Sequence, residues 1–479
     1  MDLLMKERVF GKLDEVNASP EYKKNVAATK RILEYAVMVP GWQDKLLNSP
    51  LKALAEIGLG DYPDPDCLKI LLSREEAERA NKEIKLEDMP LSVLRYRNFI
   101  REKFQSRDEM AAKDCVPKDK RFAAWRTRQR NRCWIDLGMR NASIIHTPLI
   151  FEFSLGCSVG CPFCGVAAQG LKTVFRATPE NRQMWQDILR TCKEVIGPAA
   201  GTGTCYYACE PLDCPDYEVL TADYADILGA VPQTTTAVAM RNPERTKKYL
   251  EAMRQREIKV HRFSVLSLDT LHKIMAFFTP EELLDVELLP QFPEAPDNHF
   301  TKVGRARAGE VATDETQEDG TIACVSGFVV NMAEKSIRLV TPCPSDESHP
   351  TGEIFVDRRS FTDAADFAAV LESMIADNMV IDFPRTEPLR LRETITIEET
   401  KDGIEILGRK GFKLRLTGND DIPAELYKHT AQLILTGNKS PYDIVGELMT
   451  SINAPAAHVF FILNKLGRGG IFQEPYGSK

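Results

Sequence analysis

Apolar positions follow a helical period through the first third of the chain. They recur every three to four residues in Ala27–Met38, Trp42–Ile57 and Leu91–Phe104, which predicts three helices. Ser73 stands before Arg-Glu-Glu and is a good helix start, because its hydroxyl can cap free N–H groups and acids favour the first turn. We therefore predict a helical N-terminal region over residues 1–145.

From Pro148 onward, short apolar runs alternate with amphipathic helices. Strands are expected at Leu149–Ser154, Cys205–Ala208, Thr234–Met240, Val260–Leu266 and Val286–Phe292. Helices are expected between and after them at Met184–Ile196, Tyr217–Leu228, Pro243–Arg254 and Leu268–Phe278. This alternation predicts an α/β fold with a parallel sheet, and five or six units favour a partial (β/α)6 barrel. Chemistry in such barrels lies at the C-terminal ends of the strands.

The rest of the chain changes pattern twice. Two strand-like runs, Ile322–Asn331 and Ser336–Val340, close the predicted barrel domain at 146–345, and 346–389 is predicted as a linker with one helix, Phe361–Asp377. Residues 390–479 are predicted as a separate module of three short strands followed by three helices, a pattern that fits a winged-helix fold. The strands are expected at Thr394–Glu399, Ile404–Leu407 and Lys413–Thr417, and the helices at Pro423–Leu435, Ser440–Ser451 and Ala454–Leu466.

Composition narrows the function classes. The 479 residues suit two to four domains, and a hydrophobic fraction of 43% is enough for a sizeable core. A formal charge of −8 argues against a general nucleic-acid binder. The first residues lack a secretory apolar segment, and no run approaches the roughly 18 apolar residues that span a bilayer. We expect a cytoplasmic protein without a membrane partner.

Three cysteines carry the strongest chemical signal. Cys157, Cys161 and Cys164 have CxxxCxxC spacing and follow a predicted strand. Three thiolates can hold a [4Fe–4S] cluster and leave one iron open for the amino and carboxylate groups of S-adenosylmethionine (SAM). Reduction by the cluster then cleaves SAM to a 5′-deoxyadenosyl radical. A structural zinc site would need a fourth ligand nearby, so zinc or buried thiols are the weaker interpretation.

A second group of thiols follows at Cys205, Cys209 and Cys214. They could bind a second cluster, but their spacing is irregular, so buried or loop thiols are the preferred interpretation. The basic stretch from Arg121 to Arg132 is interpreted as a solvated helix face, with a docking surface for an acidic peptide as the alternative.

The cysteine segment, with Phe163 before its last thiol, resembles the radical SAM superfamily over roughly residues 148–310. The resemblance implies that Phe163 lies at the cofactor and that Glu210 binds the SAM amino group; the alternative for Glu210 is a strand-end acid facing solvent. It also implies that Arg262 and Ser264 reach the ribose. Gly304-Arg305-Ala306 resembles a segment behind the adenine, or is a simple turn.

The C-terminal module bears on the substrate. Residues 390–479 hold 12 Lys and Arg against 11 Asp and Glu, which argues against a DNA reader. The module instead resembles the peptide-recognition element of enzymes that modify ribosomally made peptides. That resemblance implies that a precursor's leader segment adds as a strand to the small sheet. Residues 41–59 resemble such a leader, although a packed helix pair is the preferred interpretation.

The chain as a whole resembles the radical SAM peptide epimerases of the proteusin type. The resemblance rests on Arg132–Gly138, Cys157–Gly165, Tyr206–Pro211, Arg262–Val265 and Thr341-Pro-Cys343-Pro. It implies inversion of L- to D-residues in a precursor peptide, with an electron donor such as flavodoxin or ferredoxin. A weak S–H bond must return hydrogen to Cα, and Cys343 is the first candidate, ahead of Cys324. Thioether or other Cα/Cβ bond formation, and a non-catalytic SAM- or peptide-binding protein, are the alternatives.

Overall fold

The computed structural model describes residues 19–257, 259–297, 301–307 and 320–474. These residues group into two compact units. The first unit holds the described residues of 1–109, 210–212 and 233–300, and the second holds those of 110–209, 213–232 and 301–479. No helix among the described residues is both long enough and apolar enough to cross a bilayer.

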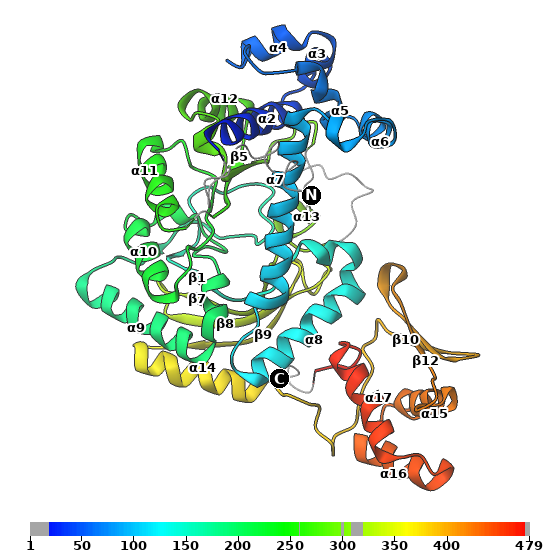
Figure 1. Cartoon of the computed structure of the whole chain (residues 1–479). Helices are drawn as coiled ribbons and strands as arrows, with labels where there is room; N and C mark the ends of the chain where they lie inside the picture. The colour runs from blue at the N-terminus through cyan, green and yellow to red at the C-terminus, as the bar shows by residue number, and fades with distance from the viewer. Residues whose placement is uncertain (1–18, 258, 298–300, 308–319, 475–479) are drawn as a thin grey trace. The chain divides into compact units, whose positions relative to one another are not determined.

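The first unit combines the N-terminal helices with a parallel sheet of three strands (Figure 1). Its helices are α2 (Pro20–Met38), α3 (Trp42–Asn48), α4 (Pro50–Glu56), α5 (Lys69–Leu72), α6 (Arg74–Glu83), α7 (Leu91–Glu109), α11 (Pro243–Arg254) and α12 (Leu268–Phe277). Its strands are β4 (Thr235–Thr236), β5 (His261–Val265) and β6 (Val286–Pro290), in that order. The helix expected at Trp42–Ile57 is divided in two at Pro50, and Ser73 caps α6 as expected, accepting from the Glu76 N–H at 3.4 Å.

A four-stranded mixed sheet is the centre of the second unit. Its order is β1 (Thr147–Glu152), β7 (Val325–Asn331), β8 (Ser336–Pro342) and β9 (Glu353–Ser360); β1 is parallel to β7 and the later neighbours are antiparallel. The helices of this unit outside its C-terminal module are α8 (Lys120–Leu137), α9 (Pro179–Val195), α10 (Tyr217–Leu228), α13 (Gly304–Arg307) and α14 (Ala364–Asn378). Figure 1 shows α14 beside β9 and α9. Phe151 and Phe153 pack edge-on against Trp185 of α9.

Three expected elements differ from the structure. The described main chain at 205–208 forms no strand, and the strand expected at Thr234–Met240 is limited to Thr235–Thr236. The latter ends early because the main-chain N–H of Ala237 donates to the Glu210 carboxylate instead of to a neighbouring strand, and the Thr236 hydroxyl donates to the same carboxylate. β9 lies in the segment expected to be a linker with one helix; its side chains are only partly buried, so it lacks a strong apolar pattern. The continuous barrel remains a prediction.

The C-terminal module begins with an antiparallel sheet of β10 (Thr396–Thr400), β11 (Gly403–Leu407) and β12 (Lys413–Thr417). The helices α15 (Ala424–Leu435), α16 (Pro441–Ile452) and α17 (Ala456–Arg468) follow, close to their expected bounds. Ser440 and Asp443 form a capping box at the start of α16. Ile135 of α8 is buried in the same apolar core as β11, α16 and α17. The winged-helix assignment remains a prediction.

Three arginines of α8 form neither the solvated face that the sequence favoured nor the docking surface that was its alternative. Arg126, Arg128 and Arg132 are buried. Arg126 donates to the carbonyls of Ile145 and His146, and Arg128 forms a bidentate pair with Glu474 at 2.8 and 3.0 Å. Both interpretations are therefore wrong for these three residues, because their guanidinium groups are used to join α8 to the rest of the unit.

Candidate functional site

The three motif cysteines lie on one closed loop after β1, which we call the cysteine loop (Cys157–Gly170). β1 is buried throughout, and the short pair of β2 (Ser154–Leu155) and β3 (Thr173–Val174) leads into and out of the loop. Cys157 N–H donates to the Gln169 carbonyl at 2.9 Å, which brings the two ends together. Gly156 has φ +88°, and a Cβ there would collide with the Gly170 carbonyl, so this closure requires glycine.

The donor set of the cysteine loop suits an iron–sulfur cluster. Cys157, Cys161 and Cys164 are each partly exposed. Main-chain N–H groups point at two of the sulfurs: Val159 at the Cys157 Sγ (3.5 Å) and Ala168 at the Cys164 Sγ (3.4 Å). Such N–H groups stabilise thiolate ligands and tune a cluster. Within the described ranges, no three His, Cys, Asp or Glu side chains converge on one metal ion. A [4Fe–4S] cluster does not require that, because each thiolate binds a different iron.

A short segment around α13 binds the cysteine loop from outside. The Arg305 N–H donates to the Cys164 carbonyl at 3.0 Å. Its guanidinium donates to the carbonyls of Cys161, at 2.8 Å, and of Ala168. Gly304 has φ +55°, and a Cβ there would collide with the Cys164 and Gly165 carbonyls. The structure therefore places Gly304 and Arg305 as a support of the cysteine loop, which is a more specific role than the simple turn considered from the sequence.

A polar cavity of about 290 Å³ adjoins the cysteine loop. The loop contributes residues 166–169 to its wall, and the sheet contributes Glu152, Asn331, Arg338 and Arg358. Glu152 is buried and fully engaged: it accepts from the Ala208 N–H at 2.7 Å and from Arg338 at 2.9 Å. Glu152 and Arg338 were missed from the sequence. An acid inside the apolar run Leu149–Ser154 was the signal that could have found Glu152.

Glu210 is buried in the first unit and does not face solvent, so that alternative is wrong. Its carboxylate accepts three hydrogen bonds, from the Leu212 N–H at 3.0 Å, the Thr236 hydroxyl at 2.6 Å and the Ala237 N–H at 2.9 Å. These donors fix the carboxylate in place.

Arg262 and Ser264 lie on one face of β5, two residues apart, while the residues between and beside them are buried. Arg262 donates to Glu287 on β6 at 2.7 Å. Lys103 of α7 pairs with the same Glu287, so Arg262 belongs to a charged cluster with the N-terminal helices. In the second unit, Phe163 is partly exposed within the cysteine loop. Binding of SAM by these residues remains a prediction.

Cys343 is buried at the end of β8, where it follows Pro342. Burial raises the pKa of its thiol to about 12, while the nearby Arg132 guanidinium acts in the opposite direction. The thiol therefore stays protonated at neutral pH. The loop after Cys343 reaches the support of the cysteine loop, because the Gly304 N–H donates to the Pro350 carbonyl at 2.7 Å.

The remaining thiols differ in burial. Cys205 and Cys214 are buried and Cys209 is partly exposed. Burial raises the pKa of Cys205 well above its usual value, and the neighbouring Cys209 and Cys214 act in the same direction. The burial of Cys205 and Cys214 agrees with the interpretation of buried thiols, and a second cluster remains untested. Cys324 is partly exposed and packs against the core around Ile150 and Val325.

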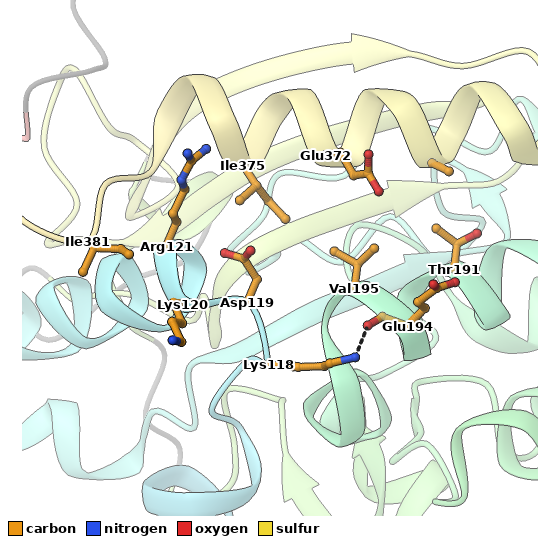
Figure 2. Close-up of a pocket in the computed structure, with 11 residues that line it drawn as sticks. Lys118, Asp119, Lys120, Arg121, Thr191, Glu194, Val195, Glu372, Ile375 and Ile381 are labelled. Atoms are coloured by element: carbon orange, nitrogen blue, oxygen red, sulfur yellow. Dashed lines mark hydrogen bonds between the residues drawn. The ribbon is translucent and has the colours of Figure 1, made fainter.

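A second hollow, of about 680 Å³, lies where the start of α8 meets the end of α9 and α14 (Figure 2). Lys118, Lys120, Arg121, Glu194 and Glu372 line it, and Lys118 donates to the Glu194 main-chain carbonyl at 3.3 Å. It shares no lining residue with the cysteine loop. Its mixture of charges selects no particular ligand, and we assign it no role in the site.

Comparison with known proteins gives limited similarity. No protein-family profile matches the chain. It is 39% identical over 316 residues to "Uncharacterized protein y4wI" of Sinorhizobium fredii (strain NBRC 101917 / NGR234), a match that covers 64% of this chain and 61% of the relative. Among solved structures, the crystal structure of BtrN in complex with AdoMet and 2-DOIA is similar with a TM-score of 0.31 and 13% identity, over 48% of this chain and 81% of that one. A TM-score this low carries no argument about fold.

Proposed function

We propose that this protein is a radical SAM enzyme that inverts L-residues to D-residues in a ribosomally made precursor peptide. The observation that carries the proposal is the cysteine loop: three partly exposed thiols, on a loop closed by Gly156, with main-chain N–H groups pointing at two sulfurs. When bound, a [4Fe–4S] cluster and SAM supply a 5′-deoxyadenosyl radical. The resemblance of the sequence motifs to peptide epimerases supports the choice of reaction.

The chain's own residues have distinct tasks in this proposal. Cys157, Cys161 and Cys164 hold the cluster, and Gly304 and Arg305 keep the cysteine loop in shape. Glu210 offers a carboxylate fixed by three donors, which suits an ammonium group such as that of SAM. A carboxylate that is already fixed binds such a group without the entropy cost of ordering its own side chain.

Cys343 supplies the second half of the inversion. With a cluster and SAM bound, the Cα hydrogen of the peptide would pass to the 5′-deoxyadenosyl radical that they supply, which would give 5′-deoxyadenosine and a Cα radical. The Cys343 S–H then gives a hydrogen atom to the other face of the Cα radical, which leaves a thiyl radical. One electron from a flavodoxin or ferredoxin and one proton from water restore the thiol. Only the protonated form can donate a hydrogen atom, and the raised pKa of Cys343 keeps it in that form.

The C-terminal module is proposed to bind the leader of the precursor. Its sheet has two edge strands, β10 and β12, that can accept another strand. Several side chains of β12 are exposed, among them Leu414. The polar cavity beside the cysteine loop is proposed to receive the peptide region that reacts, because the guanidinium groups of Arg338 and Arg358 line it and can donate to main-chain carbonyls there.

The test combines heavy water with a cysteine substitution. Reconstituted enzyme is incubated in D₂O with SAM, a reductant and a candidate precursor peptide. We expect about one deuterium on the Cα of each inverted residue, because a thiol proton exchanges with solvent. Cys343→Ala is expected to form 5′-deoxyadenosine on addition of peptide but no D-residues. Cys324→Ala is the matched control and is expected to behave as wild type.

Three outcomes would contradict parts of the proposal. Wild-type product without deuterium at Cα means that the reaction is not this inversion. A loss of two hydrogens per modified site indicates crosslink formation. D-residues formed by Cys343→Ala at the wild-type extent exclude Cys343 as the donor and make Cys324 the next candidate.

A further inference from the structure

We propose that Arg132 is a positioning residue for Cys343, and that Arg392 of the C-terminal module holds Arg132 in place through Asp136. The segment that carries the donor thiol and the module are then joined by a continuous set of charged contacts, in which Arg132 and Asp136 are buried and Arg392 is partly buried. This inference rests on the proposed function for its meaning in catalysis. The contacts themselves stand independently, and all of them lie in the second unit.

The first link joins Arg132 to the end of β8. One terminal nitrogen of Arg132 donates to the Pro342 carbonyl, and to the Thr341 hydroxyl at 3.2 Å. Pro342 is the residue before Cys343, so the guanidinium fixes the peptide unit that carries the donor. Cys133, next to Arg132 on α8, donates from its Sγ to the same Pro342 carbonyl at 3.3 Å.

The second link joins Arg132 to the module. Its other terminal nitrogen pairs with Asp136 one turn along α8, at 3.2 Å. Arg392 binds both oxygens of the same carboxylate at 2.5 Å. Arg392 also donates to the Gly470 carbonyl at 3.1 Å. One carboxylate is therefore shared by an arginine that holds the donor segment and an arginine of the module.

Burial makes this arrangement sensitive to the loss of one member. Arg132 is 6% exposed and Asp136 is 3% exposed, so a charge left without its partner has little access to water. Removing one member of a buried charge set forces the others to rearrange. The planar guanidinium of Arg132 binds a carboxylate and a carbonyl in fixed directions, which a flexible lysine cannot reproduce. A change at Arg392 is therefore expected to reach the Pro342 peptide through Asp136 and Arg132.

Binding of the leader peptide would give a function to the connection from Arg392 to the Cys343 segment. Arg392 lies four residues before β10, an edge strand of the sheet proposed to bind the leader. Thr394, between them, also reaches Asp136, at 3.5 Å. A strand added at β10 would order this segment and so favour the arrangement in which Cys343 is correctly placed. Hydrogen return would then be most efficient when the correct precursor is bound.

The first test needs neither SAM nor peptide. Folded enzyme is treated with iodoacetamide, and the alkylation rate of each cysteine is followed by peptide mass spectrometry. We expect Arg132→Gln and Arg392→Gln to raise the rate at Cys343 at least tenfold. Lys439→Gln is the matched control, because Lys439 is a cation of the same module that lies outside its strands and pairs with Glu447. It is expected to match wild type.

An internal control separates positioning from general loosening. Cys192 and Cys205 are fully buried in the same unit, and their rates should not change in any of these variants. If Arg392→Gln accelerates all three thiols equally, the residue is merely structural and the inference fails. Asp136→Asn keeps the shape of the side chain and provides a second variant, expected to act like Arg392→Gln. Wild-type alkylation of Cys343 in both variants would also overturn the inference.

The second test uses the loaded enzyme and measures D-residues formed per 5′-deoxyadenosine. In Arg392→Gln this ratio is expected to fall at least fivefold, whereas Lys439→Gln keeps the wild-type ratio. An unchanged ratio in Arg392→Gln contradicts the inference. Failure of the proposed function looks different: wild type itself then forms no D-residues, while the alkylation result is unaffected.

Discussion

The main-chain N–H of Arg305 donates to the carbonyl of Cys164, 3.0 Å away, so the last cysteine of the motif is held by a residue 141 positions later in the chain. The Arg305 guanidinium also donates a hydrogen bond to the carbonyl of Cys161. Two cysteine peptide units are thus fixed from outside the loop. Backbone bonds of this kind set where the sulfurs point, which governs how well three thiolates fit one cluster.

Arg305→Ala is expected to weaken cluster retention. The substitution removes the guanidinium bonds to the loop carbonyls but keeps the main-chain bond to Cys164, so the loop loses part of its support. Each lost bond to a charged donor costs about 1.5–3 kcal/mol. We expect the half-life of the reconstituted cluster in the presence of a chelator to shorten several-fold, measured from the visible absorption. Arg176→Ala, which removes an exposed pair with Asp216, is the control and should retain the cluster as wild type does.

Glu210→Gln is expected to weaken SAM binding without loss of iron. The carboxylate uses both oxygens to accept from Leu212, Thr236 and Ala237, and an amide has only one acceptor oxygen. With the charge gone as well, the dissociation constant for SAM should rise about 10- to 100-fold, which corresponds to roughly 1.5–3 kcal/mol. Equilibrium dialysis with labelled SAM measures this change. Thr236→Val removes one donor but keeps the carboxylate, and a larger effect of Thr236→Val than of Glu210→Gln would contradict the assignment.

His261 is expected to make the first unit sensitive to acid. Burial lowers the pKa of His261 to about 4, below its usual 6.5, and its Nδ1 accepts from the Thr234 N–H at 3.2 Å. The unfolded chain therefore binds a proton at higher pH than the folded protein. The contribution of His261 to stability is present above pH 6.5 and is lost as the pH falls towards 4.

This loss amounts to about 2 kcal/mol between pH 7 and pH 5. Urea unfolding of wild type and His261→Gln at both pH values measures it, since the variant should lose about 2 kcal/mol less than wild type over this interval. His272→Gln is the control, because His272 is exposed on α12. Equal pH dependence in wild type and His261→Gln would show that the histidine is not the titrating group.

Sequence periodicity predicted the elements that bury one face and expose the other. It failed where hydrogen bonds from distant residues determine the backbone conformation. α10 and α11 begin and end at the predicted residues because each has an apolar stripe between clear boundaries. The strand expected from Thr234 is cut short by Glu210, a residue distant in sequence. The sequence predicted a solvated face for the arginines of α8. Periodicity cannot reveal that Arg128 binds Glu474 and that Arg126 donates to the His146 carbonyl.

The candidate site shows the same division. The spacing of Cys157, Cys161 and Cys164 is a local signal, and the structure places all three on one loop. The support from Arg305 and the contact of Arg132 with Pro342 depend on chain segments more than a hundred residues apart, so neither could be derived from a local motif. Glu152 lies inside an apolar run and was the one missed residue with a local signal.

Ile135 lies on α8 yet is buried in the same core as β11 and α17, and Asn131 of α8 donates to the Arg468 carbonyl at 2.7 Å. A truncation before Arg390 would therefore strip α8 of its apolar cover and leave Arg128 and Asp136 without Glu474 and Arg392. Such a shortened chain would aggregate or misfold, and its failure to bind a peptide would say nothing about where the peptide binds. A fragment meant to carry the module therefore has to include α8 as well.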